Sequence, residues 1–191
     1  MTVLVVSATP EEAAHLPSEI PVLITGVGKV AAASAVAAAL ARAEALGEPY
    51  SLVVNIGSAG ALHDHLEGVH EIGAVLNHDL SAAALRGFGY DPQEWLTLEA
   101  GPEAVRLATG DVFVSDPVVR AGLAEQADLV DMEGYAIAWA CQRAGVPVRL
   151  VKHVSDKADE GALDWLTLVD LSARALAQWL QLTLPELRPR P

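Results

Sequence analysis

LVDMEGYAIA, residues 129–138, joins a short apolar run to a helical pattern through two carboxylates. The residues before the acids are typical of a buried strand, and Ala136, Ile137 and Ala140 then repeat at helical spacing towards Gly145. Open α/β sheets bind their ligands at the carboxyl ends of strands. The stretch therefore predicts an α/β fold and places Glu133 where such folds keep their chemistry.

A second strand-like run, from Val146 to Val154, ends in the same way at Ser155-Asp156. A single acid at the end of a strand is commonly a helix cap or a first-turn residue. Two acids, Glu133 and Asp156, at two successive strand ends favour a functional site instead.

Strand-like and helical patterns alternate along the rest of the chain. The strand-like runs are 3–7, 22–25, 52–56, 72–76, 112–115, 129–131 and 148–154, and the helical stretches are 30–46, 117–126, 133–144 and 164–182. This alternation predicts a three-layer α/β fold, in which helices flank a central, twisted, mixed and mostly parallel sheet. No element is assigned between His78 and Thr109. We expect one domain, residues 1–183, and a frayed proline-rich tail, residues 184–191.

Composition limits the classes of function. The chain has 191 residues, of which 52% are hydrophobic, a formal net charge of −13 and three lysines. No basic patch exists to neutralise a phosphate backbone, and no apolar run could span a bilayer, so neither nucleic acid nor a membrane is an expected partner. Cys141, the sole cysteine, excludes an internal disulfide and fits a reducing compartment, the cytoplasm.

Two glycine-rich turns follow predicted strands. The first turn, Gly26-Val27-Gly28-Lys29-Val30-Ala31, fits the loose G-x-G-x-x-A pattern of dinucleotide sites. The next strand, however, ends in Asn55-Ile56-Gly57 and lacks the acid that holds ribose in such sites, so a tight turn is preferred to a dinucleotide site. The second turn, 55–62, either turns tightly or offers N–H groups and the Ser58 hydroxyl to a ligand. The histidines and acids between His63 and Asp79 match no zinc-binding spacing, so neither a metal ion nor a cofactor is expected.

Seven segments together resemble the purine nucleosidase and phosphorylase superfamily, and within it most closely the 5′-methylthioadenosine/S-adenosylhomocysteine nucleosidases. They follow the family's order over nearly the whole chain and are Ser7–Glu12, Thr25–Ala32, Asn55–Leu62, Gly87–Tyr90, Thr109–Val114, Val130–Ala138 and Val154–Asp159. The resemblance implies a nucleoside phosphorylase-like fold. It also implies an N-ribosyl hydrolase that cleaves the glycosidic bond of a purine nucleoside, with a 5′-thio-substituted adenosine as the favoured substrate.

The resemblance further implies roles for single residues. Asp156 resembles the acid that protonates purine N7, Glu12 the carboxylate that positions and deprotonates the attacking water, and Glu133 the acceptor for the ribose hydroxyls. Phe113 resembles the ring that stacks on the base, Val114 the residue whose backbone reads the purine edge, and Met132 the side chain beside the sugar. The complete set of expected substrate-binding residues is Ser58, Phe88, Phe113, Val114, Met132 and Ser155.

The chemistry of glycosidic cleavage calls for these residue types. Positive charge develops on the ribose and negative charge on the departing base, so ionised carboxylates favour the first and a protonated acid relieves the second. Glycoside hydrolysis uses two carboxylates in the same way. Relatives that use phosphate resemble one another in a loop with glycine and arginine after the first strand. Here that place holds Thr9-Pro10-Glu11-Glu12, whose carboxylates repel phosphate and suit water.

The chain also departs from the family. The connection at 16–21 lacks a hairpin of the relatives, the stretch 90–109 is short, Lys152 replaces an arginine, and Ser81-Ala82-Ala83-Ala84 replaces a histidine-aspartate cluster. Futalosine or aminodeoxyfutalosine therefore remains an alternative substrate, and a nucleoside-binding protein with weak turnover remains an alternative class. We expect a homodimer, because so apolar a chain, with four tryptophans, would leave a hydrophobic patch to bury.

Overall fold

The computed structural model describes residues 2–101, 103–159, 165–184 and 187. Its strands are β1 Val3–Ser7, β2 Val22–Ile24, β3 Leu52–Ala61, β4 Val69–Asn77, β5 Trp95–Thr97, β6 Val105–Thr109, β7 Leu129–Asp131 and β8 Val148–Asp156. Its helices are α1 Lys29–Ala45, α2 Ala82–Gly87, α3 Pro117–Ala124, α4 Gly134–Ala144 and α5 Trp165–Thr183. Within the described residues, no helix combines the length and apolar character that a bilayer crossing requires.

The sheet closes on itself. Strands β3, β8, β4, β6 and β7 pair in a ring, in which β3–β8, β4–β6 and β6–β7 are parallel and β8–β4 and β7–β3 are antiparallel. Strands β1 and β2 extend the sheet from β3, and β5 extends it from β4. The prediction of an α/β fold with a mixed, mostly parallel sheet is confirmed. The predicted three-layer arrangement is wrong in part, because the central sheet closes into a barrel rather than forming one open layer.

The length of β3 explains the closure. The sequence predicts that this strand stops at Ile56 and that 57–61 form a loop, but the strand continues to Ala61. Its first half pairs with β1, and its last two residues, Gly60 and Ala61, pair with β7. A register shift in the pairing with β8, between Ala59 and Gly60, accompanies the change of neighbour. A bulge of this kind bends a strand and allows a sheet to close.

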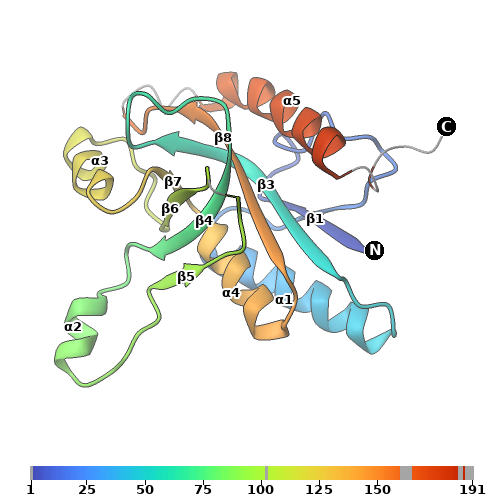
Figure 1. Ribbon diagram of the computed structural model, residues 1–191, viewed down its shortest axis with the longest axis horizontal. Coiled ribbons are helices and arrows are strands. Elements are labelled where there is room, and N and C mark those ends of the chain that lie inside the picture. The colour runs from blue at the N-terminus through green and yellow to red at the C-terminus, as the bar shows by residue number, and fades with distance from the viewer. Residues whose placement is uncertain (1, 102, 160–164, 185–186, 188–191) are drawn as a thin grey trace.

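Helices cover the sheet from two sides (Figure 1). Helices α1 and α4 pack against each other on one side and α5 lies on the other, against β8 and β3. Helix α1 buries small residues together with Val36 and Leu40, which lets it approach α4 closely. Helix α5 buries Leu176 and Leu180 against Val54 and Val151 of the sheet. The turn after β1, residues 58–60 of β3 and the ends of β7 and β8 border one cavity.

One further prediction needs correction. Residues 112–115 form no strand, and the neighbouring strand is β6, residues 105–109, in the stretch to which no element was assigned. The pattern Val-Phe-Val has high strand propensity, but Val112 and Phe113 are exposed and pair with no neighbour strand.

Part of the predicted C-terminal region lies outside the described residues. This applies to residue 164, where the last helix is predicted to begin, and to 185–186 and 188–191 of the tail. Leu184 is buried against the core.

Candidate active site

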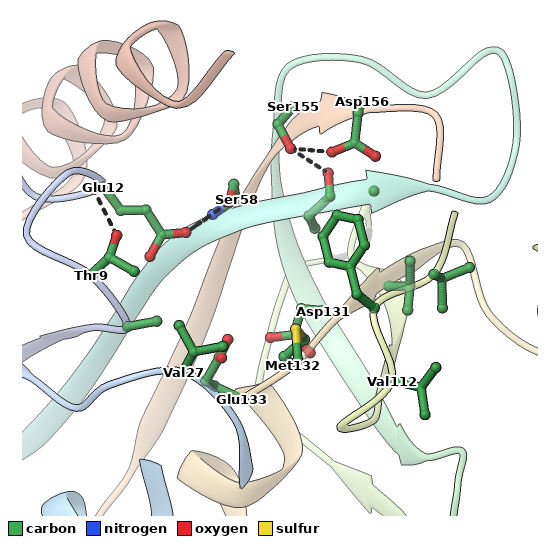
Figure 2. Close-up of a pocket in the computed structure, with 16 residues that line it drawn as sticks. Thr9, Glu12, Val27, Ser58, Val112, Asp131, Met132, Glu133, Ser155 and Asp156 are labelled. Carbon is green, nitrogen blue, oxygen red and sulfur yellow. Dashed lines mark hydrogen bonds between the residues drawn. The ribbon is translucent and has the colours of Figure 1, made fainter. Parts of the chain in front are cut away.

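A cavity of about 280 Å³ lies at the carboxyl ends of the strands (Figure 2). Its walls come from the turn after β1, from β3, from the segment after β6, from the β7–α4 junction and from the end of β8. Eight of the nine predicted site residues line it: Glu12, Ser58, Phe113, Val114, Met132, Glu133, Ser155 and Asp156. The ninth, Phe88, follows α2, is 78% exposed and does not line the cavity.

Glu12 is held in a fixed orientation. It lies in the turns that follow β1, and 4% of it is exposed. Its Oε1 accepts hydrogen bonds from the Ser58 N–H (2.6 Å) and the Ser58 hydroxyl (2.8 Å), and its Oε2 accepts one from the Ser7 hydroxyl (3.3 Å). Three donors from two residues thus fix the position of the carboxylate. Gly57 makes this arrangement possible, because a Cβ there would lie 3.3 Å from Oε1.

Glu133 closes the site from the β7–α4 junction. Its Oε1 accepts a hydrogen bond of 2.8 Å from the N–H of Gly28, which has a φ of 94° that suits only glycine. Burial and the nearby charge of Asp131 raise the pKa of Glu133 to about 7, although Lys152 opposes the shift. This carboxyl group therefore changes its charge near neutral pH.

A buried ion pair stands behind these acids. Lys152 on β8 is 1% exposed, and its Nζ lies 2.9 Å from Oδ2 of Asp131 on β7. Asp131 also accepts hydrogen bonds from the Thr109 hydroxyl (2.5 Å) and the Gly134 N–H (2.8 Å). Burial alone would lower the pKa of Lys152, but the three neighbouring carboxylates outweigh it, so the pKa is raised and the ammonium ion persists.

The sequence analysis did not identify Asp131 as a site residue and noted Lys152 only as a departure from the family. A signal was nevertheless present. Lys152 interrupts the apolar run Leu150 to Val154, and a charged residue in the middle of a buried strand requires a buried partner.

Asp156 ends β8 on the opposite side of the cavity from Glu12 (Figure 2). Its Oδ2 accepts a hydrogen bond from the Ser155 hydroxyl (2.6 Å), and its Oδ1 accepts one from the Ala158 N–H (2.8 Å). The Ser155 hydroxyl also lies 3.4 Å from the Ala59 carbonyl. Gly60 leaves room for the carboxyl group, because a Cβ at this position would lie 3.0 Å from Oδ1.

The remaining wall is apolar. Phe113 and Val112 are exposed on the segment after β6, Val114 is buried below them, and Met132 lies beside Glu133. An exposed aromatic ring next to a cavity lined by four acidic residues can cover a flat, uncharged group. Among the described residues, no group of three or more histidine, cysteine, aspartate or glutamate side chains is arranged to hold a metal ion.

Comparison with known proteins agrees with this fold. Residues 17–180 match the Phosphorylase superfamily, and the chain therefore belongs to that superfamily. It is 29% identical to the 5′-methylthioadenosine/S-adenosylhomocysteine nucleosidase of Shewanella oneidensis over 203 aligned residues, which cover 90% of this chain and 81% of the relative.

Solved structures show the same fold. A 5′-methylthioadenosine/S-adenosylhomocysteine nucleosidase from Helicobacter pylori with butyl-thio-DADMe-Immucillin-A matches with a TM-score of 0.82 and 22% identity, over 97% of this chain and 98% of that one. The futalosine hydrolase of H. pylori strain 26695 matches with a TM-score of 0.80 and 22% identity, over the same shares of the two chains. The predicted nucleoside phosphorylase-like fold is thus confirmed.

Proposed function

We propose that the protein is an N-ribosyl hydrolase that cleaves the glycosidic bond of a purine nucleoside, with 5′-methylthioadenosine and S-adenosylhomocysteine as its favoured substrates. The observation that carries this proposal is the convergence of Glu12, Glu133 and Asp156, from three separate elements, on one cavity with an apolar wall. The names of the relatives in the same superfamily support the choice of substrate.

The reaction divides the three acids by role. Asp156 acts as the general acid and gives a proton to N7 of the base, while the bond between C1′ and N9 breaks and its electron pair moves to the base. Water adds to C1′ and loses a proton to Glu12, whose three hydrogen-bond donors fix its orientation. The products are the free base and a ribose derivative.

Glu133 serves the sugar in this scheme. In its ionised form it accepts hydrogen bonds from the ribose hydroxyls and stabilises the positive charge that develops on the ring. Its pKa of about 7 leaves it partly protonated at neutral pH, so binding of the sugar and ionisation of Glu133 are coupled. Phe113, Val114, Met132, Ser58 and Ser155 complete the proposed contacts with the base and the sugar.

Water rather than phosphate is the proposed nucleophile. Among the described residues that line the cavity, none is lysine or arginine, whereas Glu12 occupies the sugar side. The nearest buried cation, Lys152, is already paired with Asp131. A phosphate dianion would therefore meet carboxylates without a matching cation.

We also propose that two copies of the chain form a cytoplasmic homodimer. Several large apolar side chains are exposed: Val27 and Val112 of the cavity lining, and Val30, Phe88 and Tyr90 outside it. A second copy packed over these side chains would bury them, and it is the setting in which Phe88 would contribute to a substrate pocket. Light scattering at micromolar concentration tests this proposal, and a purely monomeric species would reject it.

Futalosine or aminodeoxyfutalosine is the second candidate substrate, because a futalosine hydrolase shares the fold with a TM-score of 0.80. A panel of purine nucleosides, assayed for release of the base, separates the candidates. Release from 5′-methylthioadenosine supports the first proposal, and release from futalosine alone supports the second. Binding of nucleosides without release would indicate a nucleoside-binding protein.

A further inference from the structure

Lys29, the first residue of α1, lies at the centre of a polar cluster that the proposed reaction does not use. Its Nζ donates a hydrogen bond of 2.9 Å to the side-chain oxygen of Asn77 and forms an ion pair with Asp79, both at the end of β4. Its backbone N–H donates to Oδ1 of Asp111 at 2.8 Å, and Nζ lies 3.8 Å from Oδ2 of the same carboxylate. Lys29 thus connects α1, β4 and the segment after β6.

The charges in this cluster depend on Lys29. Asp79 also accepts a hydrogen bond of 2.9 Å from the Asp111 N–H, which places the two aspartates side by side. Burial would raise the pKa of Asp79, but the Lys29 ammonium and the Asp111 N–H outweigh it and hold the pKa below its usual value. Without Lys29, two adjacent carboxylates would remain with backbone donors alone and would repel each other.

The cluster adjoins the cavity on two sides. The residue before Lys29 is Gly28, whose N–H holds Glu133. Asp111 is followed directly by Val112, Phe113 and Val114, which form the apolar wall of the cavity. The same segment packs closely against His78, the residue after β4, because a Cβ on Gly110 would lie 2.2 Å from the His78 ring.

We propose that Lys29 is a positioning residue that holds residues 110–114 in the place required to cover the purine base. This inference rests on the proposed function, because it assigns the base to the wall at 112–114. An exposed salt bridge contributes little to stability, but the Lys29 side chain is only 19% exposed and joins three elements. Its role is to set the affinity for the base, while the proton transfers at Asp156 and Glu12 proceed without it.

The test uses the purified full-length protein and measures adenine binding by calorimetry, together with kcat and KM for 5′-methylthioadenosine. We expect Lys29→Met to weaken adenine binding and to raise KM by about tenfold, the loss that corresponds to one hydrogen bond to a charged group. We expect kcat to stay within about threefold of the wild type, because the reacting acids are untouched. The double variant Lys29→Met/Asp79→Asn should recover part of the affinity, because one of the two repelling charges is removed.

The matched control is Arg149→Met, which removes another partly buried ion pair, with Glu71 at 2.7 Å, outside the residues that line the cavity. It should lower the melting temperature without changing adenine affinity. If Lys29→Met fails to fold, Lys29→Gln, which keeps a hydrogen-bond donor, is measured in the same way. Adenine affinity equal to that of the wild type in the folded Lys29 variant, or a loss in kcat alone, would overturn the inference. Failure of the wild type to bind adenine and to release base would instead overturn the proposed function.

Discussion

Asp156→Asn is the substitution that separates catalysis from structure most cleanly at this site. In the structure Asp156 accepts a hydrogen bond from the Ala158 N–H, two residues further on, which is the geometry of a backbone cap. Asparagine caps backbone N–H groups as well as aspartate does. The side chain therefore has a structural role that the amide preserves and a proposed chemical role that the amide cannot perform.

The expected loss of stability is small. The amide oxygen can accept the hydrogen bond from Ala158 at 2.8 Å, and the amide NH₂ can donate to the Ser155 hydroxyl at 2.6 Å. That hydroxyl can in turn donate to the Ala59 carbonyl, which lies 3.4 Å away. Because every polar group keeps a partner, we expect the free energy of unfolding to change by less than about 1 kcal/mol.

The expected loss of turnover is large. A positioned general acid contributes about 10²–10⁴-fold to the rate, or about 3–5 kcal/mol in the activation free energy. The assay is release of adenine from 5′-methylthioadenosine, with melting temperature and adenine affinity measured on the same preparation. A stable Asp156→Asn protein with near-normal turnover would show that Asp156 is only a cap, and the general acid would have to be sought elsewhere.

Three further substitutions follow from the geometry. Gly60→Ala would place a Cβ 2.9 Å from Ala158 and 3.0 Å from the Asp156 carboxylate. We therefore expect the free energy of unfolding to fall by about 1–3 kcal/mol and turnover to fall by about 10²-fold. Lys152→Met would leave Asp131 buried without its cation and should cost about 3–5 kcal/mol in chemical denaturation. Glu133→Gln should have a higher melting temperature than the wild type, and the difference should grow as the pH rises from about 4.5 to about 7. The reason is that the raised pKa of Glu133 makes its ionisation in the folded state unfavourable in that window.

Each of these predictions has a control or a contrary outcome. Gly73 lies in β4, outside the cavity lining, and Gly73→Ala would add a Cβ 3.1 Å from Ala104. This variant should lose stability without loss of turnover, and equal turnover losses in both glycine variants would refute the role of Gly60. A change below about 1 kcal/mol for Lys152→Met would mean that the pair with Asp131 adds little. A melting-temperature difference for Glu133→Gln that is independent of pH would contradict the raised pKa.

Local patterns predicted the parts of the fold that each segment determines by itself. The helix at 30–46 and the strands at 3–7 and 129–131 appear where hydrophobic periodicity placed them. Closure of the sheet was not predictable in this way. It depends on Gly60 and Ala61 pairing with β7, and a glycine-rich stretch reads as a loop until its partner strand is known.

The candidate site shows the same division. The strand-end pattern indicated Glu133 and Asp156, and the resemblance to a family added Glu12; the three are far apart in the chain and line one cavity. Neither signal indicated the pair of Asp131 and Lys152, because an ion pair between two strands depends on their relative register and burial. Phe88 was assigned to the substrate and lies outside the cavity of the single chain, so its proposed contact requires a second copy.

The most direct test of hydrolysis at this site is the identity of the sugar product. The wild-type protein is incubated with 5′-methylthioadenosine in matched buffers with and without phosphate, and the products are separated by chromatography. We expect equal amounts of adenine in both buffers, accompanied by free 5-methylthioribose. Accumulation of a sugar 1-phosphate, or release of adenine only when phosphate is present, would contradict this expectation.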